Sequence, residues 1–192
     1  MLTRSQVRAI LDKTEVFQDG HFALEDGWHT AQATHCLRVL QHPEYATSLA
    51  ATLGAAYRAQ RPQVVLAAAG PGALLGLELA RAARARLVLT SVRDGRWQVT
   101  PGQAILPGDR AVLCEAQLTD RSDLVGWAQL VQDAGGQVTG CATIIDRTTL
   151  PWPHAWPLES LVRPDVPLVA ADACPQCQAG EPLTPARATV LL

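Results

Sequence analysis

The chain alternates short apolar runs with segments of helical periodicity. Apolar residues at three- and four-residue spacing predict helices near residues 3–13, 43–59, 73–83 and 121–134. Continuous apolar runs between turn residues predict core strands near residues 63–69, 86–90, 110–115 and 137–145. Because right-handed crossovers join consecutive parallel strands, this order indicates an α/β protein with a parallel-rich central sheet and helices on both faces.

Two further segments have recognisable local patterns. Thr3-Arg4-Ser5-Gln6 has the form of a capping box and predicts the start of the first helix. A proline-rich segment at residues 150–157 predicts a loop leading to a late strand and a tail. Its two tryptophans, Trp152 and Trp156, are expected to pack over the edge of the sheet or to form part of an interface.

Composition narrows the class of protein without specifying its activity. A length of 192 residues fits one domain, and 48% hydrophobic with 18% charged residues indicates a globular chain. The net charge of −2 and isoelectric point near 6.2 give no sign of nucleic-acid binding. The longest apolar stretch, residues 64–77, is interrupted by glycines and is not expected to span a membrane. The five cysteines form no dense framework, so we expect a cytoplasmic protein.

Residues 110–122, RAVLCEAQLTDRS, form the most informative stretch of the sequence. The apolar residues 111–114 predict a buried strand, with Glu115 at its carboxyl end. In open α/β sheets this end faces the ligand crevice, so residues 118–122 would direct backbone amides and a helix N-terminus at an anion. The alternative is an ordinary turn in which Asp120 or Ser122 caps the following helix.

This stretch resembles the phosphoribosyl-diphosphate (PRPP) motif of type I phosphoribosyltransferases. That motif has an apolar strand, two acidic residues, two apolar residues and a Thr-Thr-Gly or Thr-Gly-Gly loop. The resemblance implies that the acidic residues hold the ribose hydroxyls of PRPP. Glu115 fills the first acidic position, but Ala116 takes the second and Gln117 takes an apolar one.

The loop of the motif is only partly kept. The resemblance implies that this loop, residues 119–122, binds the 5′-phosphate of PRPP. Thr119 is retained and Ser122 supplies a second hydroxyl, whereas Asp120 and Arg121 replace a hydroxyl or glycine and a glycine. Asp120 would place negative charge beside the phosphate, and Arg121 could offset part of it.

Three other segments narrow the resemblance to orotate phosphoribosyltransferases. Residues 20–30, GHFALEDGWHT, resemble the family segment GHF-x-L-x-SG-x-HS, with acidic residues at 25 and 26 where the family has Lys or Thr and Ser. Residues 144–147, IIDR, match an apolar strand ending in Asp-Arg, which implies that Arg147 meets the carboxylate of orotate. A surface ion pair of Asp146 is the alternative. Residues 172–183 resemble the C-terminal D-x-CP-x-C-x-x-G-x-PL segment of one group of these enzymes.

Two loops complete the implied PRPP site. Ala69, Gly70 and Gly72 lie where the family cradles pyrophosphate, although a tight strand-to-helix turn would use the same residues. Residues 90–97 resemble the mobile catalytic loop, in which the family uses Arg and Lys. The only lysine of the chain is at position 13, so Arg93 and Arg96 are the available cations; a solvated hairpin is the alternative.

The sequence does not predict a metal site on protein side chains. Cys174 and Cys177 form a single C-x-x-C pair, whereas a four-ligand zinc site needs a second pair of ligands. The other cysteines, Cys36, Cys114 and Cys141, are scattered. We therefore expect buried thiols or a tail specific to this group of the family.

Taken together, the resemblance implies a single phosphoribosyltransferase-like domain, with a core at about 43–149 and a small hood from about 1–40 and 150–192. It implies transfer of phosphoribose from PRPP to orotate in pyrimidine nucleotide synthesis, with Mg²⁺ and in a homodimer. Glu115, Arg93 and Arg96 would be the catalytic residues. The substitutions predict impaired or altered activity. The alternatives are a non-catalytic nucleotide- or PRPP-binding regulatory protein, and a transferase for another acidic base.

Overall fold

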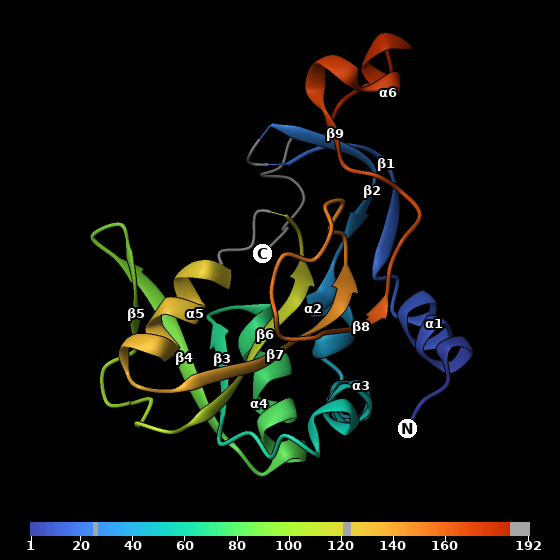
Figure 1. Cartoon of the computed structure of the whole chain (residues 1–192). Coiled ribbons are helices and arrows are strands. Elements are labelled where there is room, and N and C mark those ends of the chain that lie inside the picture. Colours follow the sequence, from blue (N-terminus) through green and yellow to red (C-terminus); the bar gives the residue numbers. More distant parts are fainter. Residues whose placement is uncertain (25–26, 121–123, 185–192) are drawn as a thin grey trace.

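A six-stranded sheet forms the centre of the molecule, as the computed structural model shows for residues 1–24, 27–120 and 124–184 (Figure 1). The strand order is β5-β4-β3-β6-β7-β8. All neighbouring pairs are parallel except β4 and β5, which form an antiparallel hairpin. The strands are β3 (Val64–Ala68), β4 (Arg86–Arg93), β5 (Arg96–Val99), β6 (Arg110–Leu118), β7 (Gln137–Asp146) and β8 (Leu158–Val162).

Helices cover both faces of this sheet and enclose two apolar clusters. One cluster packs the sheet against α1 (Arg4–Lys13), α2 (Cys36–Leu40), α3 (Pro43–Gly54) and α4 (Pro71–Ala83). The other packs the opposite face against α5 (Leu124–Asp133), whose Trp127 is fully buried. The predicted α/β class, with a parallel-rich sheet covered on both faces, is confirmed.

A small three-stranded sheet joins the two ends of the described chain. It consists of β1 (Phe17–Ala23), β2 (Trp28–Thr34) and β9 (Val169–Ala170), all antiparallel to their neighbours. A 3-10 turn, η2 (Ala171–Ala173), and a short helix, α6 (Pro175–Gln178), follow β9. Figure 1 shows the small sheet at the end of the large sheet toward which β6 points. The expected hood from about 1–40 and 150–192 stays a prediction, because α1, α2 and β8 of those segments pack with the large sheet.

Most expected elements are present, with shifted ends. The capping box at Thr3 and Gln6 is confirmed, because each side chain accepts from the other residue's backbone amide. The helix expected to reach residue 59 ends at Gly54 and continues only as a 3-10 turn, η1 (Ala55–Tyr57). The strand expected to end at Glu115 extends to Leu118, since its pairing with β7 continues to that residue.

The proline-rich segment is a loop that leads to β8, as expected. The Trp152 indole N–H donates to the Trp156 carbonyl at 2.7 Å, and the two rings meet edge to face. Both tryptophans pack against the apolar cluster beneath α5. Of the two roles expected for them, packing over the sheet is therefore confirmed. Within the described ranges, no helix combines the length and apolarity needed to cross a bilayer.

Close packing between η1 and β7 fixes the centre of the sheet. The Tyr57 ring lies directly over Gly140, where an added Cβ would be only 2.2 Å from a ring carbon. The Tyr57 hydroxyl donates to the Cys141 carbonyl. Only glycine leaves room for this ring, and the ring is almost completely buried.

Replacing this glycine should destabilise the fold through overpacking. We expect Gly140→Ala to lower the free energy of unfolding by about 1–3 kcal/mol, because the ring or strand must move to admit the methyl group. Urea unfolding measures the change. In a Tyr57→Ala background the same substitution should cost much less, so a double-mutant cycle without coupling would contradict this explanation.

Candidate functional site at the carboxyl ends of β3, β6 and β7

The turn between β3 and α4 lies against the carboxyl end of β6. Gly70 has φ +92° and ψ −147°, a conformation that essentially only glycine adopts. A Cβ on Gly72 would be 3.4 Å from the Cys114 carbonyl oxygen and 3.9 Å from the Glu115 Cα. Ala69 precedes this turn, and α4 begins at Pro71. The first turn of a thirteen-residue helix therefore points its amide groups toward this edge of the sheet.

Glu115 is a largely buried carboxyl group at this edge. It lies on β6 opposite Thr143 of β7, and the Gly72 backbone approaches from the β3 side. Loss of solvent around the carboxylate raises the pKa of Glu115 from its ordinary value of 4.5 to about 7. A carboxyl group that titrates near neutrality in a crevice beside a helix N-terminus is typical of a functional site.

The Asp120 carboxylate forms hydrogen bonds with the segment that follows β7. Its Oδ2 accepts from the Thr149 amide at 2.9 Å and from the Thr149 hydroxyl at 2.5 Å, and its Oδ1 accepts from the Leu150 amide at 3.2 Å. Burial is the largest single effect and opposes ionisation, but these hydrogen bonds and the charge of Arg163 together outweigh it and lower the pKa of Asp120. Asp120 is thus a stable anion that ties the loop after β6 to the segment after β7.

The other residues of this loop are only partly described. Thr119 follows β6 directly, and the Arg147 amide donates to the Leu118 carbonyl at 2.8 Å, so the ends of β6 and β7 are adjacent. Arg121 and Ser122 lie outside the described residues. Among the described residues, Asp120 accepts from residues 149 and 150, and capping of α5 by Asp120 or Ser122 stays a prediction.

Arg147 joins the large sheet to the small one. Nη1 donates to the Gln32 carbonyl at 2.7 Å and to the Thr34 hydroxyl at 3.3 Å, and Nη2 donates to the Thr30 hydroxyl at 2.9 Å and the Val166 carbonyl at 3.0 Å. The buried Nε has no partner among the described residues. Burial lowers the pKa of Arg147 to about 10, so the guanidinium stays charged at neutral pH.

Asp146, the neighbour of Arg147, is not at the surface. The residue is 2% exposed. Its Oδ1 accepts from the Thr148 amide at 2.9 Å and from the Thr148 hydroxyl at 2.7 Å. Its Oδ2 is 3.5 Å from Arg163 Nη1. The ion pair of Asp146, the alternative expected from the sequence, is therefore present, but its carboxylate is buried and not at the surface.

Arg93 and Arg96 face each other across an exposed hairpin. They are paired at the ends of β4 and β5, and Asp94 and Gly95 form the turn with φ values of +51° and +71°. Two consecutive positive φ values are typical of a tight two-residue hairpin turn. The hairpin that the sequence left as an alternative is therefore the local structure, and a role for these arginines in diphosphate binding stays a prediction.

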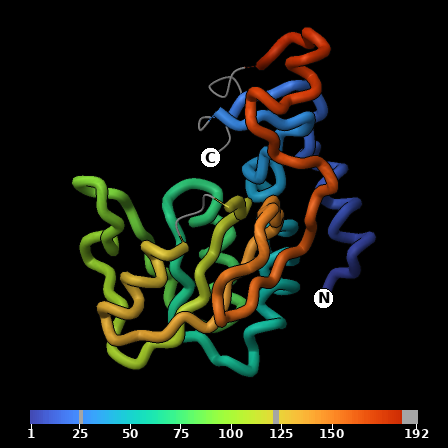
Figure 2. The backbone as a smooth tube through the Cα atoms, turned by 45° about the horizontal axis from the view of Figure 1, so that its top comes forward, coloured from blue at the N-terminus to red at the C-terminus, as the bar shows by residue number. Residues whose placement is uncertain are grey.

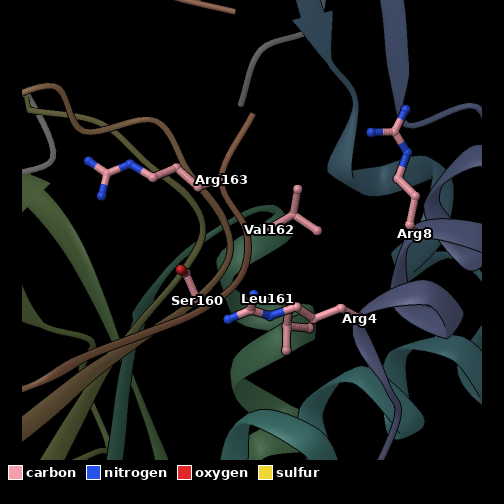
Figure 3. A pocket seen from close by; sticks show the side chains of 6 residues that line it. All are labelled: Arg4, Arg8, Ser160, Leu161, Val162 and Arg163. Atoms are coloured by element: carbon pink, nitrogen blue, oxygen red, sulfur yellow. The ribbon is translucent and has the colours of Figure 1, made fainter. Parts of the chain in front are cut away.

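Two surface hollows lie on the described part of the chain, one beside the candidate site and one farther away. One, of about 190 Å³, is lined by Asp146, Arg147 and residues 148–149 and 163–168, beside the candidate site. The second, of about 390 Å³, lies between α1 and β8 and is lined by Arg4, Arg8 and residues 160–163. Figure 3 shows Arg163 extending away from Arg8, whose side chain runs upward, so their guanidinium groups do not converge on one ligand. Arg8 is instead paired with Asp12 at 2.8 Å.

The structure also brings together four side chains that sequence reasoning did not group. His21 and His29 of the small sheet meet Cys174 and Cys177 of the C-terminal segment. The signal was present, because both histidines lie in the GHFALEDGWHT segment, but only a second cysteine pair was considered as a partner for C-x-x-C.

Comparison with known proteins places the chain in a family. No family model matches it. The orotate phosphoribosyltransferase of Pelotomaculum thermopropionicum is 30% identical over 181 residues, which cover 94% of this chain and 95% of that protein. The chain belongs to the orotate phosphoribosyltransferase family. The orotate phosphoribosyltransferase of Caldanaerobacter subterraneus subsp. tengcongensis is 29% identical over 182 residues, covering 95% and 96% of the two chains.

Solved structures agree on the fold. The crystal structure of orotate phosphoribosyltransferase from Aeropyrum pernix superposes with a TM-score of 0.65 at 19% identity, covering 82% of this chain and 93% of that one. The type I phosphoribosyltransferase fold predicted from the sequence is therefore confirmed. The correspondence of the strand that carries Glu115 to the PRPP motif stays a prediction from the sequence.

The pKa of Glu115 predicts a specific dependence of stability on pH. The unfolded chain loses this proton near pH 4.5, but the folded protein holds it to about pH 7. The unfolded state therefore binds fewer protons between these values, so the free energy of unfolding should fall as pH rises through this window and then level off. The loss would be at most about 3 kcal/mol.

Urea unfolding of the wild type and Glu115→Gln tests this dependence at about pH 5 and about pH 8, on either side of the titration. The wild type should lose stability relative to Glu115→Gln as pH rises. Glu44→Gln, which changes an exposed carboxylate on α3, serves as the control and should follow the wild type. Parallel curves for the wild type and Glu115→Gln would contradict the burial of an ionisable group at this edge.

Proposed function

We propose that the chain binds PRPP at the edge formed by β3 and β6, and that it transfers the phosphoribosyl group to orotate less efficiently than a site with an intact PRPP motif. The observation that carries this proposal is the Asp120 carboxylate, which occupies the phosphate loop and is tied to Thr149 and Leu150. The orotate phosphoribosyltransferases that resemble this chain support orotate as the acceptor and pyrimidine nucleotide synthesis as the setting.

The half of the site that would receive the diphosphate keeps its main requirements. Gly70 allows the backbone to turn sharply, and Gly72 lets the first turn of α4 approach β6. The helix N-terminus favours a polyanion, as it does in other nucleotide-binding α/β proteins. Arg93 and Arg96 would supply the mobile positive charge from the β4–β5 hairpin, which contains no lysine.

The half that would receive the 5′-phosphate is altered. Asp120 is an anion where the family has a neutral hydroxyl or glycine, and repulsion between it and a phosphate disfavours binding. Thr119 and Ser122 remain as hydroxyl donors. On β6, Ala116 offers no oxygen to the ribose, which leaves Glu115 alone to accept from the ribose hydroxyls. Each lost charged hydrogen bond typically weakens an interaction by about 1.5–3 kcal/mol.

The protein residues fit Mg²⁺ only as part of a complex with PRPP. Mg²⁺ commonly uses one or two carboxylates together with substrate phosphates, and Glu115 would be the one carboxylate from β6. Bound with PRPP, the ion would neutralise negative charge on the diphosphate leaving group. Deprotonated Glu115 is the stronger acceptor for ribose hydroxyls and the form that binds a cation, so its pKa of about 7 predicts weaker PRPP binding as pH falls below neutrality.

The acceptor side of the proposed site depends on Arg147. A guanidinium recognises a planar carboxylate best with two parallel N–H groups. The described contacts commit both Nη atoms to the small sheet and to Val166, so only Nε remains unsatisfied. Because Nε is itself buried, orotate would reach the guanidinium only if a contact around Arg147 opens. This restriction also supports low activity.

A non-catalytic PRPP- or nucleotide-binding protein is the second candidate. The same departures favour it, because binding through the diphosphate half does not require the 5′-phosphate loop or an acceptor. The proposed homodimer would apply to either candidate, with the β4–β5 hairpin of one subunit reaching the site of the other. Turnover distinguishes the two functions.

Calorimetry with PRPP and Mg²⁺, followed by an orotate turnover assay on the same preparation, tests the proposal. We expect saturable binding with slow formation of the nucleotide and pyrophosphate. Binding without any turnover would favour the non-catalytic candidate. Absence of binding would overturn the assignment of the site around Thr119 and Gly72.

Substitutions in the loop test why activity is low. The triple variant Ala116→Asp, Asp120→Thr and Arg121→Gly should raise PRPP affinity by about tenfold or more, because it restores a ribose acceptor and removes a repulsive charge. Asp120→Asn is the matched control: it removes the charge but keeps an oxygen for Thr149. A gain with Asp120→Asn alone would identify charge as the main defect. Unchanged affinity in every variant would mean that the loop does not limit binding.

A further inference from the structure

The two ends of the described chain meet at four potential metal ligands. His21 lies on β1 and His29 on β2, which pair as an antiparallel hairpin. Cys174 precedes α6 and Cys177 lies within it. Figures 1 and 2 both show the segment containing β9 and α6, in red, beside the β1–β2 hairpin, in blue. The four ligand atoms all lie within 4.8 Å of one another.

The distances between these atoms match a tetrahedral zinc site. The His21 Nε2 is 3.4 Å from the Cys174 Sγ and 3.6 Å from the Cys177 Sγ, and the His29 Nδ1 is 3.3 Å from the Cys177 Sγ. Zn–S bonds of about 2.3 Å and Zn–N bonds of about 2.0 Å, at a tetrahedral angle, separate nitrogen and sulfur by about 3.5 Å. Since all four ligand atoms lie within 4.8 Å of one another, small side-chain adjustments are enough for them to surround one ion.

The hydrogen bond on the far side of His21 orients the ring for coordination. Its Nδ1 is 3.1 Å from the Glu181 carbonyl oxygen, which only accepts, so Nδ1 carries the proton. The Nε2 lone pair then faces the two sulfurs. Metal-bound histidines commonly donate their other N–H to a backbone carbonyl in this way. The His29 ring packs edge to face against the His21 ring, and its Nδ1 also faces the Cys177 sulfur.

Hydrogen bonds among the four side chains alone would satisfy them poorly. His21, His29 and Cys174 are 5%, 6% and 2% exposed. With Nδ1 protonated, His21 has one acceptor nitrogen for two thiols, and the single S–H of Cys177 cannot serve both histidines. A cation that accepts one lone pair from each side chain satisfies all four at once. Two thiolates and two imidazoles are the ligand set that zinc prefers.

We propose that His21, His29, Cys174 and Cys177 bind one Zn²⁺ ion that fastens the C-terminal segment to the β1–β2 hairpin. Four protein ligands fill a tetrahedral shell, so the ion is structural and has no open position for substrate. This proposal is independent of phosphoribosyl transfer, because none of the four side chains is among the residues assigned to PRPP or orotate.

The site would hold an otherwise weakly fixed part of the fold. The strand β9 has only two residues, and its pairing with β2 is limited to Trp28 and His29. Beyond it, the described contacts to β1 include Thr184 with His21 and Ala23, and the Gln176 side chain with Gly20. A metal that joins both segments adds stability that such a small sheet lacks. It also holds β2, whose Thr30, Gln32 and Thr34 contact Arg147.

Metal analysis of the full chain tests the proposal without any substitution. Protein purified under reducing conditions from zinc-containing medium should carry about one zinc per chain. After exchange, Co²⁺ should show the intense visible bands of a tetrahedral site and the charge-transfer absorption of thiolate ligands. A chain that holds no zinc, or a cobalt spectrum without thiolate character, would overturn the proposal.

Ligand variants test the assignment to these residues. Cys174→Ser with Cys177→Ser, and separately His21→Gln, should abolish stoichiometric zinc binding, whereas Cys36→Ala, which removes a buried thiol elsewhere, should retain it. Hydrogen exchange should become faster at residues 17–34 and 169–184 in the ligand variants and stay unchanged in β3, β6 and β7. If the variants fail to fold, chelator treatment of the wild type provides the same exchange comparison. Full zinc content in the variants would overturn the assignment.

Discussion

The parallel pairing of β6 with both β3 and β7 is the constraint on which the rest of the structure depends. Its register brings three strand ends to one edge: the Gly70 turn, the Glu115 carboxyl and the Asp146-Arg147 pair. The interlocking of Tyr57 with Gly140 supports this register from one face, and Trp127 packs on the other. Without this pairing, these three segments, which are far apart in the sequence, would not meet at one edge.

The site at this edge has two halves that differ in how far they depart from the family motif. The α4 side retains its glycines and helix N-terminus, and Glu115 remains beside it. The loop side carries Asp120, which the structure directs into hydrogen bonds with Thr149 and Leu150. A substitution that both adds charge and ties the loop to its neighbour is more consequential than a single lost contact. The proposed low activity therefore depends mainly on Asp120.

The sequence predicted the parts of the fold that local patterns encode. The capping box at Thr3 and the three- and four-residue spacing of apolar residues predicted most helices. The continuous apolar runs of β3, β6 and β7 predicted these core strands. It did not predict β1 and β2 as strands, because their exposed and buried residues do not alternate regularly and a bulge lies between Asp19 and Phe22.

Long-range contacts explain what the sequence could not provide at the sites. The partners of Asp120 lie about thirty residues away, and the partners of Arg147 on the small sheet lie more than a hundred residues away, so neither set has a local signature. The His21–Cys174 contact spans 153 positions. Each half of that cluster is an unremarkable pair in the sequence, and only the antiparallel hairpin and the returning tail bring them together.

Phosphorus NMR of PRPP, titrated with the protein in the presence of Mg²⁺, tests the central claim most directly because it observes each phosphate separately. If the diphosphate half of the site is intact and the 5′-phosphate half is disabled by Asp120, the diphosphate resonances should shift and broaden while the 5′-phosphate resonance changes little. An equally large change at the 5′-phosphate in the wild-type protein would contradict the account.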